Sequence, residues 1–241
     1  YFLKLFDSRL PQQVANYSKL PYWESSPKFG RGNPKYKYEG DAHDWWVWHD
    51  AYPFEHFEEQ VPRFMSEFGF QSFPSQQVLD YIVGDKQLDL NDGAIKSHQK
   101  HHRGFQLIDE YMARDFPVPT KAEDYAYVSQ LVQARGMRMG IEAHRRAKPY
   151  NMGTLFWQLN DCWPAISWSS IDYFGQWKAL HYAAREAFKN VLISFEQDGD
   201  MLKVYVINDH LQSLNETLHL VIQDFRGNRI WEAEEAIKIS S

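Results

Sequence analysis

Short apolar runs that end in polar residues alternate with longer helical patterns over the first 190 residues, and this alternation constrains the fold most. Each run is too short for a helix and is typical of a buried strand. The runs lie at 20–23, 45–48, 64–68 and 153–159. Apolar residues recur at helical spacing within 76–148 and again over 179–188. Strand followed by helix, repeated, predicts an α/β fold of the (β/α) barrel kind.

The two ends of the chain have different patterns. Residues 2–18 have apolar side chains near helical spacing and predict a surface helix with a kink at Pro11. After residue 189, apolar and polar residues alternate in four short segments around turns at Asp198-Gly199 and Arg226-Gly227-Asn228, which predicts antiparallel strands. These segments are 193–196, 202–207, 218–224 and 230–239. We therefore expect two domains, 1–189 and 190–241, the second being an incomplete β-sandwich.

Charge and cysteine content exclude several classes of function. The net charge of −6 and the interspersed Lys and Arg provide no basic face, so no nucleic-acid partner is predicted. No apolar run approaches the roughly 20 residues that cross a bilayer, so no membrane partner is predicted. Cys162 is the only cysteine, which excludes an internal disulfide. The group His98, His101 and His102 is typical of a solvated face, and neither a metal nor a cofactor is assigned.

In a parallel barrel, the active site gathers where strands end, so polar residues after an apolar run are the candidates. They are Glu24, His49, Glu67, Gln158, Asn160 and Asp161. Spacing alone leaves two alternatives open for such a buried acid, a catalytic group or a structural ion pair. An aromatic content of 16% suits both stacking on sugar rings and a large aromatic core.

Four segments resemble the barrel strands of the β-mannosidases of glycoside hydrolase family 2. Residues 63–75, RFMSEFGFQSFPS, resemble the strand that carries the nucleophile of that family. Residues 152–182 begin with MGTLFWQLNDCWP and resemble its eighth strand, the following loop and the last helix. KLPYWESSP at 19–27 and GDAHDWWVWH at 40–49 resemble its fifth and sixth strands. The resemblance implies the second half of a (β/α)8 TIM barrel, followed by a partial all-β immunoglobulin-like sandwich.

The same resemblance implies a retaining glycosidase that releases terminal β-D-mannose, with Glu67 as the nucleophile. Its ligand is then a β-mannoside oligosaccharide or glycoconjugate. The family also contains β-galactosidases, β-glucuronidases and exo-glucosaminidases, which remain alternatives. The acid of the family follows an Asn at the end of the fourth strand, so we expect it upstream of Tyr1, and Glu24 is rejected because it matches the fifth strand. The compartment stays unassigned; the resemblance is compatible with a soluble periplasmic, secreted or lysosomal protein.

Other residues acquire expected roles from their positions. Trp157 matches the Trp that the resembled family uses as a platform beneath the first sugar. The alternative is that Trp157 is a core residue. Asn160 and Asp161 either bind sugar hydroxyls or cap the loop. His49 is expected at the end of the sixth strand, where its ring N–H is a candidate donor to Glu67. Trp46 and Trp48 are two apart on that strand and therefore share a face. Either one of them lines the pocket or both pack in the core.

A non-catalytic interpretation also stays open. By itself the 241-residue chain lacks the acid and four strands, so we expect it to be inactive, a carbohydrate-binding or structural fragment. A half barrel exposes two sheet edges and half of its core. It is therefore expected to associate with the missing N-terminal half of the enzyme or with another copy of itself.

Overall fold

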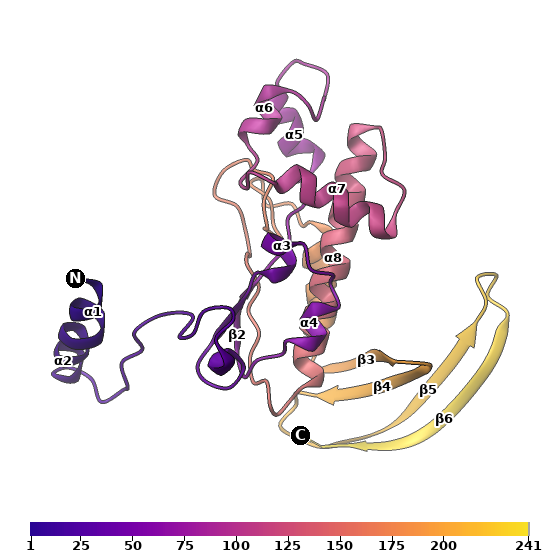
Figure 1. Ribbon diagram of the computed structural model, residues 1–241. Helices are drawn as coiled ribbons and strands as arrows, with labels where there is room; N and C mark the ends of the chain where they lie inside the picture. The colour runs from indigo at the N-terminus through magenta and orange to yellow at the C-terminus, as the bar shows by residue number, and fades with distance from the viewer. Residues whose placement is uncertain (241) are drawn as a thin grey trace. The chain divides into compact units, whose positions relative to one another are not determined.

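The computed structural model describes residues 1–240, which divide into two compact units, Tyr1–Arg185 and Glu186–Ser241. The first unit is mixed α/β (Figure 1). Its regular elements are α1 (Phe2–Lys4), a π-helical turn (Leu5–Arg9), α2 (Leu10–Ala15), a 3₁₀ turn (Pro34–Lys37), β1 (Ala42–Asp44), α3 (Trp46–Asp50), α4 (His56–Glu59), β2 (Met65–Phe68), α5 (Gln76–Val83), α6 (Gly93–Ser97), α7 (Gly104–Asp115), α8 (Ala122–Arg146) and α9 (Ala179–Ala187). None of the helices among residues 1–240 combines the length and apolar character needed to cross a membrane.

Three parallel segments form the framework of this unit. β1 pairs with β2 in parallel, with His43 opposite Glu67 and Asp44 opposite Phe68. On the other side of β2, residues 152–157 run alongside it, with backbone hydrogen bonds from Met65 N to the Gly153 carbonyl at 2.9 Å and from Trp157 N to the Phe68 carbonyl at 2.8 Å. Helices connect each segment to the next, as parallel pairing requires. These segments do not close a barrel within residues 1–240, so the closed architecture is absent from the described chain.

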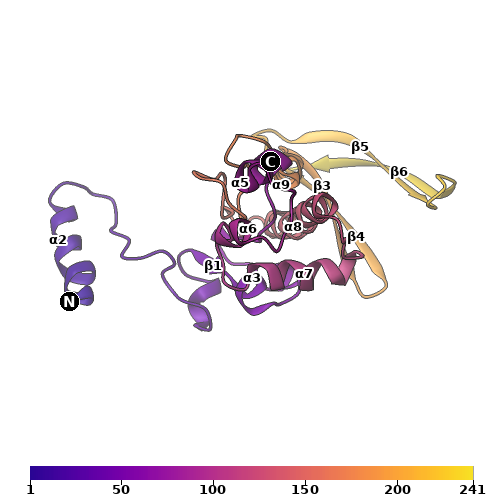
Figure 2. The same cartoon turned by 90° about the horizontal axis from the view of Figure 1, so that it is seen from above.

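Aromatic packing between helices and β2 forms the core. The long helix α8 packs against α4 and α7 (Figures 1 and 2). Phe68 of β2 lies edge-on to Phe57 of α4 at 5.2 Å between ring centroids. Gly140 of α8 allows this approach, because a Cβ there would come within 2.7 Å of the Phe68 ring. The C-terminal half of β2 is thereby fixed from its helical side.

Most predicted elements of this unit are confirmed, but two predicted strands are wrong, and the strand predicted at 153–159 is present only as an isolated parallel bridge between Thr154 and Met65. The helical pattern at 2–18, the strand at 64–68, the helices within 76–148 and the final helix are all present. Residues 20–23 have no regular structure, and 45–48 form helix α3 instead of a strand. Asp44 Oδ1 accepts the backbone N–H of Trp46, the first residue of α3, at 3.2 Å, which satisfies one of the N–H groups that a first turn leaves unpaired. The strand lies just before it, at Ala42–Asp44.

The second unit consists of two antiparallel hairpins, as the alternating pattern predicts. β3 (Val191–Asp198) pairs with β4 (Met201–Asn208), and β5 (Leu214–Gln223) pairs with β6 (Arg229–Ile239). Gly199 and Gly227 have positive φ in the two tight turns, at 59° and 84°, where a side chain would be strained. Each hairpin is a separate two-stranded sheet in the described residues.

Candidate active site

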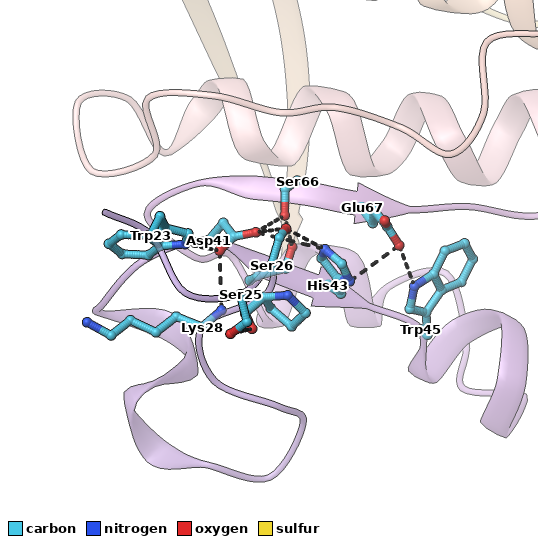
Figure 3. A network of polar contacts seen from close by, with 11 residues as sticks. Trp23, Ser25, Ser26, Lys28, Asp41, His43, Trp45, Ser66 and Glu67 are labelled. Atoms are coloured by element: carbon cyan, nitrogen blue, oxygen red, sulfur yellow. Dashed lines mark hydrogen bonds and ion pairs between the residues drawn. The ribbon is translucent and has the colours of Figure 1, made fainter. Parts of the chain in front are cut away.

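Glu67 lies near the C-terminal end of β2, where two ring nitrogens lie close to one of its carboxylate oxygens. Trp45 Nε1 donates to Oε2 at 3.2 Å, and His43 Nδ1 lies 3.3 Å from the same atom (Figure 3). The Glu67 side chain is 29% exposed, whereas that of His43 is 16% exposed. Within residues 1–240 the other oxygen, Oε1, receives no hydrogen bond. The carboxylate is therefore oriented through one oxygen.

A β-bulge brings these groups together. The register advances one residue on β1, from Ala42 to His43, while it advances two on β2, from Met65 to Glu67. Ser66 is the additional residue, and its hydroxyl donates to Asp41 Oδ2 at 2.6 Å. Bulges re-aim side chains next to active sites, because they change the alternation of a strand locally. Here both Ser66 and Glu67 contact residues of the 41–43 segment.

Trp157 lies beside this strand end, as expected for a residue of the neighbouring segment. Its backbone N–H bonds to the carbonyl of Phe68, the residue after Glu67, and 43% of its surface is exposed. An accessible indole at the end of a strand is suited to stack against the apolar face of a sugar. The role of Trp157 as a sugar platform stays a prediction.

Asn160 and Asp161 have different environments. Asn160 is exposed. Asp161 is only 7% exposed and accepts hydroxyl hydrogen bonds from Ser167 at 2.7 Å and from Ser169 at 2.6 Å. Of the two alternatives for Asp161, sugar binding or a structural role in the loop, these contacts favour the second. Asn160 keeps both.

The residues expected on the sixth strand lie on helix α3 instead, which changes their relation to Glu67. Trp46 and Trp48 therefore do not share a strand face, because successive positions two apart on a helix diverge. Trp48 is fully buried against Phe70 and Trp168, which agrees with core packing. Trp46 is half-buried and contacts the rings of Tyr36 and His56.

His49 is not the ring that reaches Glu67. Its Nδ1 lies 3.3 Å from Nε2 of His101, and its ring packs against Trp45. Burial, together with the smaller effects of neighbouring His49, His102 and Arg103, lowers the pKa of His101 to about 4. Burial also lowers the pKa of His49. This histidine pair is therefore uncharged at neutral pH and lies behind the indole of Trp45.

His43 and Trp45 are the residues that the sequence analysis missed. Polar residues at the ends of apolar runs pointed to His49, because the run 45–48 was interpreted as the strand. The available signal was Asp41-Ala-His43-Asp44, in which polar side chains two apart face one side of a short strand, followed by an Asp that caps a helix. Only the pairing of β1 with β2 then brings His43 to Glu67.

Gly69 allows the close approach of the segment that carries Trp157. A Cβ at this position would be 2.3 Å from the backbone oxygen of Trp157 and 3.1 Å from the Trp45 ring. We expect Gly69→Ala to separate β2 from residue 157, destabilising the protein by about 1–3 kcal/mol and displacing the indole. Thermal unfolding and tryptophan fluorescence would measure both. Gly30→Ala is the matched control, because nothing lies within 4 Å of that position; equal behaviour of the two variants would contradict the prediction.

Asp44 predicts a pH dependence of stability. Burial raises its pKa to about 7, against smaller opposite effects of the Trp46 N–H and Arg31. The folded protein therefore holds a proton that the unfolded chain releases near pH 4, so stability falls as pH rises from about 4 to about 7. Asp44→Asn removes this loss but leaves a buried amide N–H without a partner. We expect a net gain on the order of 2 kcal/mol at pH 8 and none at pH 4, measured by thermal unfolding at both values.

No cluster of three or more His, Cys, Asp or Glu side chains suited to a metal occurs within residues 1–240. A cavity of about 720 Å³ lies among the 87–91 loop, Phe105 of α7 and the start of α8, and it contains none of the predicted site residues. Its walls are mixed, with Leu90 and Phe105 beside Asp89 and Lys96. Glu67 therefore lies at the β1–β2 pair and not in this cavity.

Comparison with known proteins places this geometry in context. No family model matches the chain. The "Beta-mannosidase B" proteins of Aspergillus terreus and of Aspergillus niger are each 30% identical over 200 residues, covering 80% of this chain and 24% of theirs. The chain thus spans about a quarter of the length of these relatives.

Solved structures give the same relation. A β-D-mannosidase from Dictyoglomus thermophilum superposes with a TM-score of 0.91 at 32% identity, covering 99% of this chain and 30% of that protein. An exo-chitosanase, CsxA of Amycolatopsis orientalis, shares the fold at a TM-score of 0.65 and 16% identity, over 78% of this chain and 24% of its own. The chain is homologous to a segment of the β-mannosidases of the glycoside hydrolase family 2 type.

Proposed function

We propose that this chain carries the nucleophile of a retaining exo-β-mannosidase, and that Glu67 Oε1 is the attacking atom. The observation that supports it most is the asymmetry of the carboxylate. Oε2 contacts Trp45 and His43, whereas Oε1 receives no hydrogen bond within residues 1–240. A carboxylate fixed through one oxygen attacks with the other at little reorganisation cost.

The reaction proceeds by double displacement. Oε1 attacks the anomeric carbon while an acid protonates the departing glycosidic oxygen, which gives a mannosyl ester of Glu67. Water then attacks the same carbon, the ester bond breaks and the carboxylate is restored. Retention of configuration follows from the two inversions. Trp157, exposed beside the end of β2, is the proposed platform for the sugar, with Asn160 as a candidate for its hydroxyls.

The acid lies outside this chain in this proposal. A retaining enzyme needs its two carboxyl groups about 5 Å apart. Asp41 does not meet this requirement, because the whole imidazole of His43 lies between it and Glu67. Within residues 1–240, β1 pairs only with β2, so its outer edge is open. In a (β/α)8 barrel, the segment 19–27 that resembles the fifth strand would cover that edge, and the fourth strand before it would bring the acid. In the isolated fragment, a second copy is the alternative partner.

Trapping of the covalent intermediate tests the proposal. The full-length protein is treated with an activated 2-fluoro-mannoside, digested, and the modified peptide is identified by mass spectrometry. We expect a mannosyl adduct on Glu67, and no adduct with the Glu67→Gln variant. Labelling of another residue, or full labelling of the variant, would refute the role of Glu67.

Parallel reactions address the sugar. 2-Fluoro derivatives of galactose, glucuronic acid and glucosamine represent the other sugars of the family, and the structural similarity to an exo-chitosanase makes the glucosamine comparison necessary. We expect the mannoside to inactivate fastest. The isolated 241-residue chain should bind but not hydrolyse an aryl β-mannoside; hydrolysis by it would show that the acid lies within the chain after all.

A further inference from the structure

A hydrogen-bond network continues from His43 on the side away from Glu67. Ser26 Oγ lies 3.2 Å from His43 Nε2, and it also donates to Asp41 Oδ2 in a very short contact (Figure 3). Asp41 Oδ2 lies 3.8 Å from His43 Nε2. The imidazole is thus between two carboxylates, with Glu67 at Nδ1 and Asp41, through Ser26, at Nε2.

Asp41 is a charged carboxylate held by several donors. Besides Ser26, it accepts from the Ser66 hydroxyl at 2.6 Å, the Lys28 backbone N–H at 3.3 Å and the Trp23 indole N–H at 3.4 Å. Burial by itself would raise the pKa of Asp41, but the hydrogen bonds from Ser26, Ser66 and Trp23 hold it below its usual value. Its side chain is 14% exposed, so solvent screens it only partly.

An oxygen acceptor lies beside each nitrogen of the His43 ring. The Ser26 hydroxyl donates its hydrogen to Asp41 Oδ2, which leaves the Ser26 oxygen as an acceptor for Nε2 at 3.2 Å. On the other side of the ring, Nδ1 lies 3.3 Å from Glu67 Oε2. An imidazole placed between two carboxylates is in the surroundings that favour a cation.

We propose that Asp41, acting through Ser26, is a positioning residue that keeps His43 a cation beside Oε2 of Glu67, and that this cation accelerates release of the sugar from Glu67. The proposal rests on the nucleophilic role of Glu67. The charged groups that face the ring are Glu67 from β2 and Asp41 from the segment before β1. Ser26 and Trp45 are its neutral neighbours, and the Lys28 ammonium lies over the Trp23 ring instead.

The charge affects the two chemical steps in opposite ways. In the ester intermediate, Oε1 is bonded to the sugar and Oε2 is the carbonyl oxygen. When water attacks the anomeric carbon, the Oε1–carbon bond breaks, its electron pair returns to the carboxylate, and the water proton passes to the general base. Negative charge then develops on Oε2, which the preorganised cation stabilises. In the first step that charge is lost, so the same cation does not assist the attack.

The experiment separates these steps in the full-length protein. The 2-fluoro-mannosyl intermediate is formed on the parent enzyme and on Asp41→Asn and Ser26→Ala, and its spontaneous turnover is followed by recovery of activity. We expect turnover to slow about 10- to 100-fold in both variants. With an ordinary substrate, kcat and KM should fall together, while kcat/KM, which reports the attack step, should change less than about 3-fold.

Controls distinguish positioning from a structural role. Ser26→Thr keeps the hydroxyl and should retain parental turnover. Asp44→Asn changes a buried carboxyl on the same strand, on the opposite face from His43, and should also turn over normally. Thermal unfolding of Ser26→Ala, a change at an exposed residue, should match the parent.

Two failures have different meanings. If the parent forms no adduct at Glu67, the proposed function is wrong. If the parent forms the adduct but Asp41→Asn and Ser26→Ala release the sugar at the parental rate, the role of Asp41 is refuted while that of Glu67 stands. A uniform fall in kcat/KM with unchanged release would likewise contradict the proposal, because it would indicate a general disturbance of the site.

Discussion

Replacement of Glu67 by Gln should lower turnover of an aryl β-mannoside in the full-length protein by at least about 10³-fold, with a much smaller change in KM. The amide has the shape of the carboxylate, so Trp45 and His43 can still contact it, but it lacks the charge and the nucleophilic oxygen. Steady-state kinetics at saturating substrate measure the effect. Glu110→Gln, an exchange of the same kind on α7, should retain parental turnover.

External nucleophiles give a second readout for this position. Glu67→Ala leaves space near the anomeric carbon, so azide should restore part of the activity and give an α-mannosyl azide, the product of a single inversion. Near-parental hydrolysis by Glu67→Gln would contradict the assignment. Azide rescue of the Glu110→Gln control, in contrast, has no basis in this mechanism.

Replacement of Lys178 by Met should destabilise the loop after residue 157 by about 1–3 kcal/mol at about pH 10, the range for leaving a buried carbonyl without its hydrogen-bond donor. Lys178 is 1% exposed, and its ammonium donates to the carbonyls of Ser72 and Ser167 at 3.3 Å each. It thereby joins the segment after β2 to the loop that contains Asp161. Hydrogen exchange read by mass spectrometry over 65–75 and 158–171 should detect the loss in the full-length protein.

The shifted pKa of Lys178 also predicts how the stability of the folded protein changes with pH. Burial lowers the pKa of Lys178 to about 7, while Asp161 and Asp172 oppose that effect. Between about pH 7 and 10.5 the unfolded chain holds a proton that the folded protein lacks, so stability rises with pH over that window. Lys178→Met should lose this rise. Lys96→Met, at an exposed position of α6, should keep the rise of stability with pH. Loss of the rise in this control would show that Lys178 is not its source.

Local pattern was sufficient for the helices and for the strand that carries Glu67. The spacing of apolar residues predicted α7 and α8, and the alternation after residue 189 predicted the two hairpins, because these signals depend on neighbours along the chain. The segment 45–48 failed for the same reason. A run of four apolar residues fits a buried strand and a short helix equally, so periodicity does not distinguish them. In the structure the run is helical, and the N–H of Trp46 bonds to Asp44 Oδ1.

The sequence by itself determined the type of most elements, the homologous segment and the position of Glu67 on β2. Only the tertiary structure decided which groups surround that carboxylate. His43, not His49, reaches it, because parallel pairing and the bulge at Ser66 set the register across β1 and β2. Register depends on hydrogen bonds between segments more than twenty residues apart, and no periodicity within one segment contains that information.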